Sequence, residues 1–364
     1  MRLHVFEKMT ELERIKQPIA EELTRYVQLF DSVLTHEEDF MRRVLEYVRG
    51  RKGKMMRPIL VLLLAKELGT IAEPTLHAAV SLELLHTSSL IHDDLAGKCL
   101  GCDSDKLYSI AAMVEFIHTS TLLHDDVVDE SEERRGKASV RKVYDNKVAV
   151  LLGDYMLAKT LSQSAMTGHI GIVDAVARLG ATLAEGEILQ LSHVEQESFS
   201  ETTYFKIIHR KTGALFEACG ELAALSMHAD ADFLQRARTL CSLIGASFQI
   251  RDDIFDYYDD EAIGKPRGND LLEGKLTLPL IYALKTDADP EALACARRVK
   301  AMESTPEDRA FLIDYAKSRG GIANAEAVMD DYRRQALELL AGFSNQEVRE
   351  ALQTYVDFVI GRNV

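Results

Sequence analysis

The chain has 364 residues, of which 47% are hydrophobic, so it is long enough for one large domain or two ordinary ones and apolar enough to bury a core. Lys and Arg number 43 against 58 Asp and Glu, which gives a formal net charge of −15. Because proteins that coat nucleic-acid phosphates usually run basic, this balance disfavours a nucleic-acid partner, although it allows a local basic pocket.

Apolar residues recur at three- and four-residue spacing along most of the chain, which is typical of packed α-helices. Only 7 Pro and no Trp occur, and this composition disfavours β-sandwiches and barrels. Glycine-bearing breaks fall near residues 97–105, 168–171, 264–269 and 318–321. In chain order we expect helices over residues 59–68, 76–91, 111–123, 148–164, 170–190, 203–227, 232–257 and 277–284, and further helices in the C-terminal third.

No change of composition separates two halves of the chain, so we predict a single all-α domain over residues 1–364, built as a large helical bundle. No stretch approaches the ~18 consecutive apolar residues of a membrane-spanning helix, and residues 1–8 lack a hydrophobic signal core. Five cysteines do not make a disulfide framework. We therefore expect a cytoplasmic protein with no transmembrane segment.

One segment of the chain occurs twice. Residues 82–94 read Leu-Glu-Leu-Leu-His-Thr-Ser-Ser-Leu-Ile-His-Asp-Asp, and residues 114–126 read Val-Glu-Phe-Ile-His-Thr-Ser-Thr-Leu-Leu-His-Asp-Asp, an offset of 32 residues. A solenoid repeats its unit throughout and this chain does not, so we infer a local duplication of one helix and its lead-in loop, near residues 64–127. Residues 82–94 are called the upstream copy below, and residues 114–126 the downstream copy.

Two aspartate clusters each end a largely apolar run. In each cluster the first and last aspartates are four residues apart and share one helical face. Such carboxylates repel one another unless a cation lies between them, and a few hard oxygen ligands with room for phosphate suit Mg²⁺. A solvated acidic helix end is the alternative for one cluster alone, but two matching clusters favour a metal site. The first cluster is Asp125, Asp126 and Asp129, and the second is Asp252, Asp253 and Asp256.

Basic residues accompany the two clusters: some follow a cluster directly in the sequence, and others lie further upstream. Guanidinium and ammonium groups bind phosphate, so their combination with acidic metal ligands indicates a diphosphate held through Mg²⁺. Read singly, each of them is more often an exposed surface residue. They are Lys54, Arg57, Arg134, Arg135, Lys211, Lys265 and Lys275.

These motifs resemble those of the trans-isoprenyl diphosphate synthases, or polyprenyl synthetases. Paired Asp-Asp-x-x-Asp motifs with such flanks are far more specific than a single short motif. The resemblance implies the helical bundle of the isoprenoid synthases with a central apolar tunnel, and a homodimer. The matching stretches are residues 53–58, 118–129, 134–136, 211–212, 248–256, 264–265 and 268–275.

The resemblance also implies a reaction in which isopentenyl diphosphate is condensed head-to-tail onto an allylic diphosphate. Three Mg²⁺ ions would be bridged by the allylic diphosphate and by Asp125, Asp129 and Asp252. The ions would stabilise the leaving diphosphate while an allylic cation forms and the isopentenyl alkene attacks it. Asp126, Asp253 and Asp256 would support the ligands.

The basic and polar residues are divided by the resemblance between two substrates. Arg134, Lys211, Gln249 and Lys265 match contacts to the allylic diphosphate, and Thr212 and Lys275 belong to matching substrate-binding motifs. Lys54, Arg57, His118 and Arg135 match the metal-free isopentenyl site. A core histidine is the alternative for His118.

Product length is partly readable from the residues before the first cluster. In the family, bulky side chains four and five residues before its first aspartate block the tunnel. Thr121 and Ser120 hold those positions and are small, which favours a long chain, roughly C30 to C45, over C15. Close helix packing is the alternative reason for small residues there.

Two features depart from the family pattern. The family's Gly-Gly-Lys-Arg-x-Arg-Pro reads Lys-Gly-Lys-Met-Met-Arg-Pro over residues 52–58, which keeps Lys54 and Arg57. Asp93 lies 36 residues after Arg57, which is close to the spacing in the family, whereas Asp125 lies 68 residues after Arg57. Because only the downstream copy is followed by the third aspartate and the two arginines, we predict that Asp125 is catalytic. The apolar residues of a displaced upstream copy would then need cover, for which a dimer partner is one source.

The sequence therefore predicts a Mg²⁺-dependent synthase of a long-chain trans-polyprenyl diphosphate, which could be delivered to a membrane. A short-chain (C15 or C20) synthase and a catalytically silent partner subunit are the alternatives. The complete second cluster and basic motifs argue against a silent subunit, and a terpene cyclase would not need Lys54 and Arg57. Cys99 and Cys102 form a lone C-x-x-C pair that we interpret as part of a loop.

Overall fold

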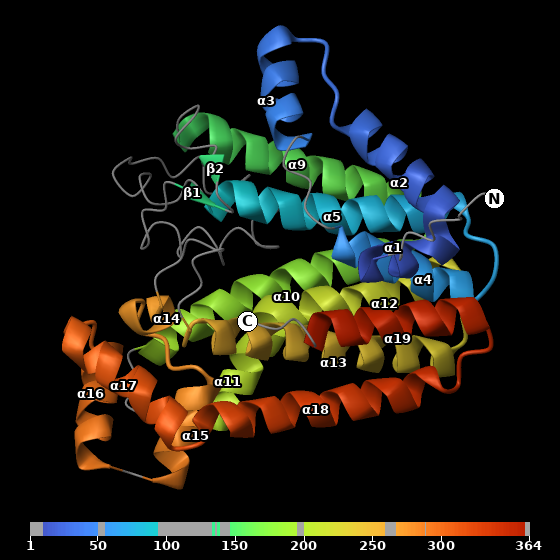
Figure 1. Ribbon diagram of the computed structural model, residues 1–364. Helices are drawn as coiled ribbons and strands as arrows, with labels where there is room; N and C mark the ends of the chain where they lie inside the picture. Colours follow the sequence, from blue (N-terminus) through green and yellow to red (C-terminus); the bar gives the residue numbers. More distant parts are fainter. Residues whose placement is uncertain are drawn as a thin grey trace, which may run out of the picture.

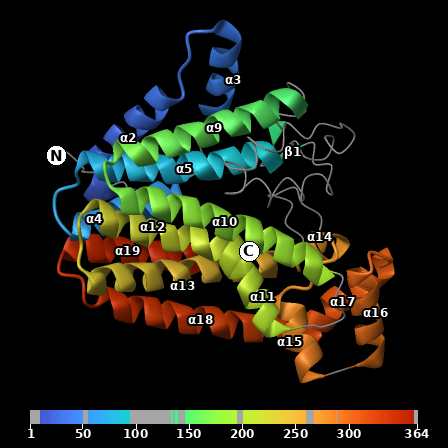
Figure 2. The same cartoon turned by 180° about the vertical axis from the view of Figure 1, so that it is seen from behind.

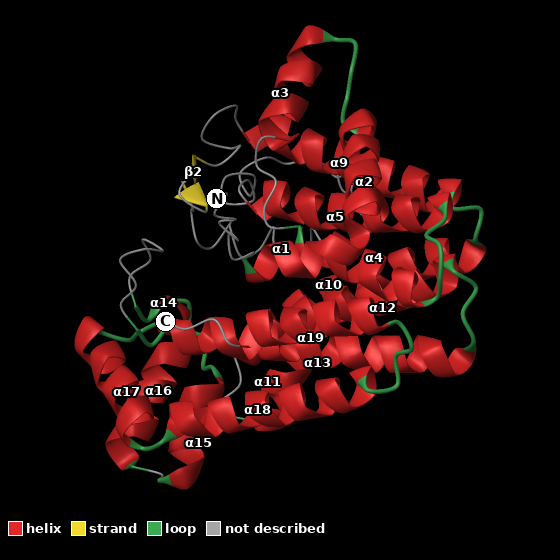
Figure 3. Ribbon diagram, turned by 45° about the vertical axis from the view of Figure 1, so that its right-hand side comes forward, coloured by secondary structure: helices red, strands yellow, loops and turns green. Residues whose placement is uncertain are grey.

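The computed structural model describes residues 10–49, 55–93, 133–134, 137–138, 146–194, 200–258, 267–287 and 289–360. Within these ranges the chain is helical apart from turns and one short antiparallel pair of strands (Figures 1 and 3), so the predicted all-α class is confirmed. The N-terminal elements are α1 (Glu11–Lys16), η1 (Gln17–Ile19), α2 (Ala20–Val33), α3 (Asp39–Arg49), α4 (Met56–Glu67) and α5 (Glu73–Asp93).

The remaining elements follow in chain order. They are β1 (Glu133–Arg134), β2 (Lys137–Ala138), α9 (Asn146–Met166), α10 (Ile170–Val194), α11 (Glu201–Ile208), η3 (His209–Gly213), α12 (Ala214–Ser226), α13 (Ala231–Phe255), α14 (Asn269–Leu272), α15 (Leu278–Thr286), α16 (Pro290–Lys300), α17 (Pro306–Ser318), α18 (Gly321–Leu340) and α19 (Gln346–Ile360).

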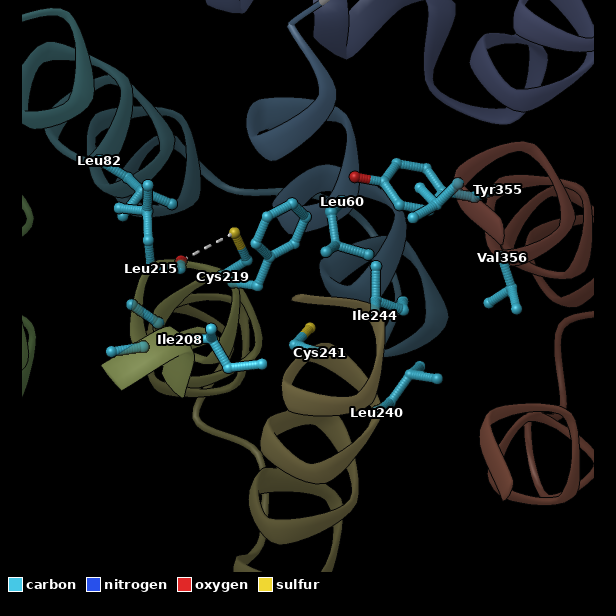
Figure 4. Close-up of a cluster of buried hydrophobic side chains, with 14 of the residues drawn as sticks. Leu60, Leu82, Ile208, Leu215, Cys219, Leu240, Cys241, Ile244, Tyr355 and Val356 are labelled. Atoms are coloured by element: carbon cyan, nitrogen blue, oxygen red, sulfur yellow. Dashed lines mark hydrogen bonds between the residues drawn. The ribbon is translucent and has the colours of Figure 1, made fainter. Parts of the chain in front are cut away.

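Helix α4 lies at the centre of the core. All its residues from Ile59 to Ala65 are fully buried, as expected of a helix that is apolar around its whole circumference. Pro58 is tolerated because it lies in the first turn, where backbone N–H groups have no partner within the helix. Figure 4 shows Leu60 of α4 among side chains from α5, α12, α13 and α19.

The long helices lie side by side in successive layers (Figures 1 and 2). α9 packs on α5, α5 packs on α4 and α12, α12 packs on α13, and α13 packs on α18. Gly220 allows the close approach of α12 to α13, since a Cβ atom there would lie 2.5 Å from the carbonyl oxygen of Ala237. The short helices α14 to α17 gather at one end of the bundle, and α3 projects away from it.

Several predicted boundaries are confirmed. A turn containing Gly168 separates α9 from α10, and α17 ends at Ser318 three residues before α18 begins. The predicted helix over residues 203–227 is confirmed as a continuous helical run of α11, η3 and α12, within which η3 is a π-helical turn. The helix predicted over residues 111–123 lies outside the described ranges. Among the described helices, none is both long and apolar enough to cross a membrane.

The expectation that the upstream copy lies outside the core is wrong. Its residues up to Asp93 form the second half of α5, where Leu82 and Leu84 are fully buried. This helix packs against α9, α4, α12 and α2 of the same chain, so Leu82 and Leu84 are covered without a dimer partner. The upstream copy continues α5, which only residues 68–72 connect to α4, so this short connection places it beside the central helix. Burying a leucine side chain there contributes about 1.5–3 kcal/mol. The downstream copy lies outside the described residues.

Candidate active site

The second aspartate cluster lies at the C-terminal end of α13, and its three carboxylates have different surroundings. Asp252 is exposed, Asp253 is only 4% exposed, and Asp256 is half-buried at the C-cap of the helix. This end of α13 lies beside α11 and α14 (Figure 1). The cluster is therefore not three equivalent ligands, although its spacing is regular.

Asp253 is held by two hydrogen bonds inside the bundle. The Tyr204 hydroxyl donates to Oδ2 over 2.6 Å, and the Gln249 amide donates to Oδ1 over 2.8 Å. Burial raises the pKa of Asp253 to about 7, and the two hydrogen bonds oppose this effect because they favour the charged form. With each oxygen engaged by the protein, Asp253 is placed to support the neighbouring ligands.

Asp256 organises the loop that follows α13. Its carboxylate accepts hydrogen bonds from the backbone N–H groups of Asn269 and Asp270, at 2.9 and 3.1 Å, and so caps α14. Its own carbonyl accepts from the N–H of Gly268, whose φ of 77° suits glycine. Asp256 therefore fixes the backbone of the segment that contains the predicted Lys275.

Lys211 and Thr212 lie on the π-helical turn η3, an element that is often found at functional sites. Thr212 donates its hydroxyl hydrogen to Oε1 of Gln249 over 2.7 Å. Glycines on both neighbouring helices admit this turn: a Cβ atom on Gly186 would lie 2.8 Å from Cβ of Arg210, and one on Gly245 would lie 3.1 Å from Cα of Gly213. The structure thus brings Thr212, Gln249 and Asp253 into one hydrogen-bonded chain.

Arg57 lies in the first turn of α4 and is half-buried. Its guanidinium group lies over the Phe216 ring, 5.6 Å from the centroid, and Phe216 in turn contacts Phe248. Its Nε atom is buried and has no hydrogen-bond partner. Such an atom is costly to leave unsatisfied, so it fits a group that accepts an anionic ligand.

Lys275 is engaged within the protein. Its ammonium group forms an ion pair with Glu273, and its backbone N–H donates to the carbonyl of Asp270 over 2.8 Å. A contact from Lys275 to substrate stays a prediction. Nine predicted site residues lie outside the described ranges: Lys54, His118, Ser120, Thr121, Asp125, Asp126, Asp129, Arg135 and Lys265. Arg134 lies in β1, but its side chain is not described.

The exposed carboxylate of Asp252 is a hard oxygen donor of the kind that Mg²⁺ prefers, so this end of α13 fits the ion, whereas both oxygens of Asp256 accept backbone hydrogen bonds. Within the described ranges, no three His, Cys, Asp or Glu side chains come together to hold a metal by themselves. The predicted ligand set of Asp125, Asp129 and Asp252 is therefore only partly described. Helix α5, which ends at Asp93, points to the same end of the bundle as α13 (Figures 1 and 2).

Two residues of this site were not predicted from the sequence. Tyr204 is buried on α11 and contacts Asp253 from 49 residues away, so no local spacing indicates it. Asp270 lies within a predicted motif, but its role there was not recognised. Burial, and after it the neighbouring carboxylates of Asp253 and Asp256, raise the pKa of Asp270 well above its ordinary value.

Comparison with known proteins gives the class of this fold and site. A family model described as polyprenyl synthetase matches residues 38–99 and 95–315, and the two stretches meet between the upstream and downstream copies. The octaprenyl diphosphate synthase of Escherichia coli is 38% identical over 274 residues, 75% of each chain. Heptaprenyl diphosphate synthase component 2 of Geobacillus stearothermophilus is 33% identical over 302 residues, 83% of each chain.

Comparison with a solved structure indicates the same class of protein. The geranylgeranyl pyrophosphate synthase from Bacteroides thetaiotaomicron has 41% sequence identity and a TM-score of 0.77, and the similarity covers 97% of this chain and 100% of that one. The chain therefore belongs to the polyprenyl synthetase family of trans-prenyltransferases.

Proposed function

We propose that this prenyltransferase adds isopentenyl diphosphate to an allylic diphosphate repeatedly and releases a long-chain trans-polyprenyl diphosphate. The observation that carries the proposal is the hydrogen-bonded chain from Thr212 through Gln249 to Asp253. It joins the turn bearing Lys211 to the helix end bearing Asp252, so a phosphate-binding cation and a metal-type carboxylate are held by one network. Octaprenyl and heptaprenyl relatives support the long product.

In this proposal Asp125, Asp129 and Asp252 would hold the Mg²⁺ ions, three in number, that bind the allylic diphosphate. When bound, the metal supplies positive charge that stabilises the departing diphosphate. Asp253 and Asp126 orient the ligands beside them, and Asp256 fixes the loop after α13. Arg134, Lys211, Gln249 and Lys265 bind the allylic diphosphate in this proposal, with Thr212 and Lys275 in support.

The isopentenyl site of the proposal consists of Lys54, Arg57, His118 and Arg135. Among these, the structure describes the side chain of Arg57, whose buried and unsatisfied Nε supports an anionic ligand there. The phenyl ring of Phe216 beneath the guanidinium helps to hold it in a fixed orientation. The product tail runs in a central tunnel past Thr121 and Ser120.

A shorter product is the second candidate, because one similar solved structure is a geranylgeranyl pyrophosphate synthase. Purified protein incubated with Mg²⁺, labelled isopentenyl diphosphate and farnesyl diphosphate, followed by chromatographic sizing, separates the two. We expect products of roughly C30 to C45, because the small side chain of Thr121 would leave the proposed tunnel open. A product that ends at C20 would support the second candidate, and no product with any primer would favour a silent subunit.

We propose a homodimer as the working assembly. The name of one relative, heptaprenyl diphosphate synthase component 2, leaves a partner subunit of another sequence as the alternative. Light scattering gives the oligomeric state of the purified chain, and an assay of the same sample shows whether the chain is active alone. An active homodimer would support the proposal, and a chain that is inactive alone would support a second subunit. Within the described ranges Cys219, Cys241 and Cys295 are free thiols, which supports the proposal of a reducing, cytoplasmic location.

A further inference from the structure

Tyr204 makes a contact that the family resemblance did not indicate. It lies on α11, is 6% exposed, and donates its hydroxyl hydrogen to Oδ2 of Asp253 over 2.6 Å. A short hydrogen bond from a buried hydroxyl to a carboxylate is stronger than a neutral one. Water cannot readily replace it, because both residues are buried.

The contact closes a loop of connections between two elements. Lys211 lies on η3, seven residues after Tyr204. The next residue of η3, Thr212, donates its hydroxyl hydrogen to Gln249. Gln249 donates to the other oxygen of Asp253, one helical turn further along α13. Asp253 is therefore bonded to α11 directly and to η3 through Gln249, and the two bonds together fix how η3 lies against the end of α13.

We propose that Tyr204 is a positioning residue, which fixes Asp253 and thereby the spacing between Asp252 and Lys211. The inference rests on the proposed function, in which Asp252 binds metal and Lys211 binds the allylic diphosphate. Without the hydroxyl, Oδ2 of Asp253 loses this hydrogen bond, and the Gln249 amide alone then orients the carboxylate. The metal–diphosphate complex then binds to a site that is less well organised.

A second tyrosine offers a matched control. Tyr282 on α15 donates its hydroxyl hydrogen to Oε1 of Glu201 over 2.9 Å, and Glu201 lies on the same helix as Tyr204. Both hydroxyls hold α11, but only that of Tyr204 holds a residue of the second aspartate cluster. Loss of either hydroxyl affects stability, whereas only loss of the Tyr204 hydroxyl is expected to affect metal and diphosphate binding.

The test compares Tyr204→Phe with Tyr282→Phe and the unchanged protein. The first readout is the rise in melting temperature caused by MgCl₂ with inorganic diphosphate, titrated in MgCl₂. The second is the pair of KM values for farnesyl and isopentenyl diphosphates. For Tyr204→Phe we expect the half-maximal MgCl₂ concentration and the KM for the allylic substrate to rise by about tenfold, with the KM for isopentenyl diphosphate little changed. Tyr282→Phe should keep the MgCl₂ dependence of the unchanged protein.

Each outcome decides the proposal. An unchanged MgCl₂ dependence in Tyr204→Phe, or an equal change in Tyr282→Phe, would make Tyr204 an ordinary core tyrosine. A Tyr204→Phe protein that fails to fold would contradict the proposal too, since the hydroxyl would then be required by the fold. If the unchanged protein shows no rise in melting temperature with MgCl₂ and diphosphate, the proposed function itself fails, which is a different result.

Discussion

The three aspartates of the second cluster hold three different positions at the residue scale. Asp252 faces solvent, Asp253 is buried under Tyr204 and Gln249, and Asp256 caps the backbone of α14. The motif spacing predicts that Asp252 and Asp256 share a helical face, but it carries no information on what lies opposite each carboxylate. Those partners come from residues up to 49 positions away, so only the folded chain reveals them.

The different surroundings of these carboxylates give a first prediction. Asp252→Asn should lower kcat/KM by about 10²-fold or more, because a charge at the metal is lost, while the free energy of unfolding changes by only about 0.5 kcal/mol. Asp256→Ala should also destabilise the unliganded protein by about 0.5–2 kcal/mol, since the cap of α14 is removed. Steady-state kinetics and chemical denaturation measure the two effects. Equal destabilisation by both variants would contradict the assignment.

Thr121 gives a prediction about product length. Thr121→Phe should shorten the product to C15 or C20, because a bulky side chain four residues before Asp125 would obstruct the proposed tunnel. Ser89 holds the equivalent position in the upstream copy, so Ser89→Phe is a matched control that should leave product length unchanged. Chromatographic sizing of the products measures both. Shortening by Ser89→Phe alone would place the tunnel beside the upstream copy instead.

At the scale of elements, glycines allow helices to approach where the site is assembled. Spacing of apolar residues correctly predicted α13 with its aspartate end and the helical run formed by α11, η3 and α12, but it did not predict that η3 is a π-helical turn. The three- and four-residue spacing of apolar residues identifies a helix but does not specify where a π-helical turn lies within it. The close packing of η3 against α10 and α13 depends on Gly186 and Gly245, which lie on these two helices and face the turn.

The contact of α12 with α13 can be tested at Gly220. A Cβ atom there would lie 2.5 Å from a backbone oxygen, so Gly220→Ala must push the helices apart, at a cost of about 1–3 kcal/mol. The better helix propensity of alanine recovers at most about 1 kcal/mol, so we expect net destabilisation in chemical denaturation. In Gly342→Ala, the control, the nearest atom is the flexible guanidinium of Arg236 at 3.0 Å. A stability loss as large in this control would argue against the close-approach explanation.

For the whole molecule we propose one polyprenyl synthase bundle that carries a 32-residue insertion, as the sequence predicts. Apolar content and spacing predicted the bundle, but they could not decide which copy enters the core, because both copies are equally apolar. The buried side chains of Leu82 and Leu84 show that the upstream copy contributes to the core. The family-model match in two stretches that meet at residues 95–99 supports an insertion here.

Deletion of residues 95–126 tests whether the insertion is dispensable. The deletion joins Asp94 directly to Val127, so the end of α5 would read Asp-Asp-Val-Val-Asp, a complete first cluster. We expect the shortened protein to fold and to incorporate isopentenyl diphosphate at least as fast as the full chain, because the core positions of α5 are unchanged. A folded but inactive protein would show that the downstream copy is needed where it stands.

We propose that this prenyltransferase uses Asp125, Asp126 and Asp129 as its first metal cluster. The most direct measurement is Mg²⁺-dependent incorporation of labelled isopentenyl diphosphate by three proteins: the unchanged chain, Asp125→Ala with Asp126→Ala, and Asp93→Ala with Asp94→Ala. We predict product from the unchanged chain and from the upstream double variant, and none from the downstream double variant. Equal loss of incorporation in both double variants, or no product from the unchanged chain, would contradict the account.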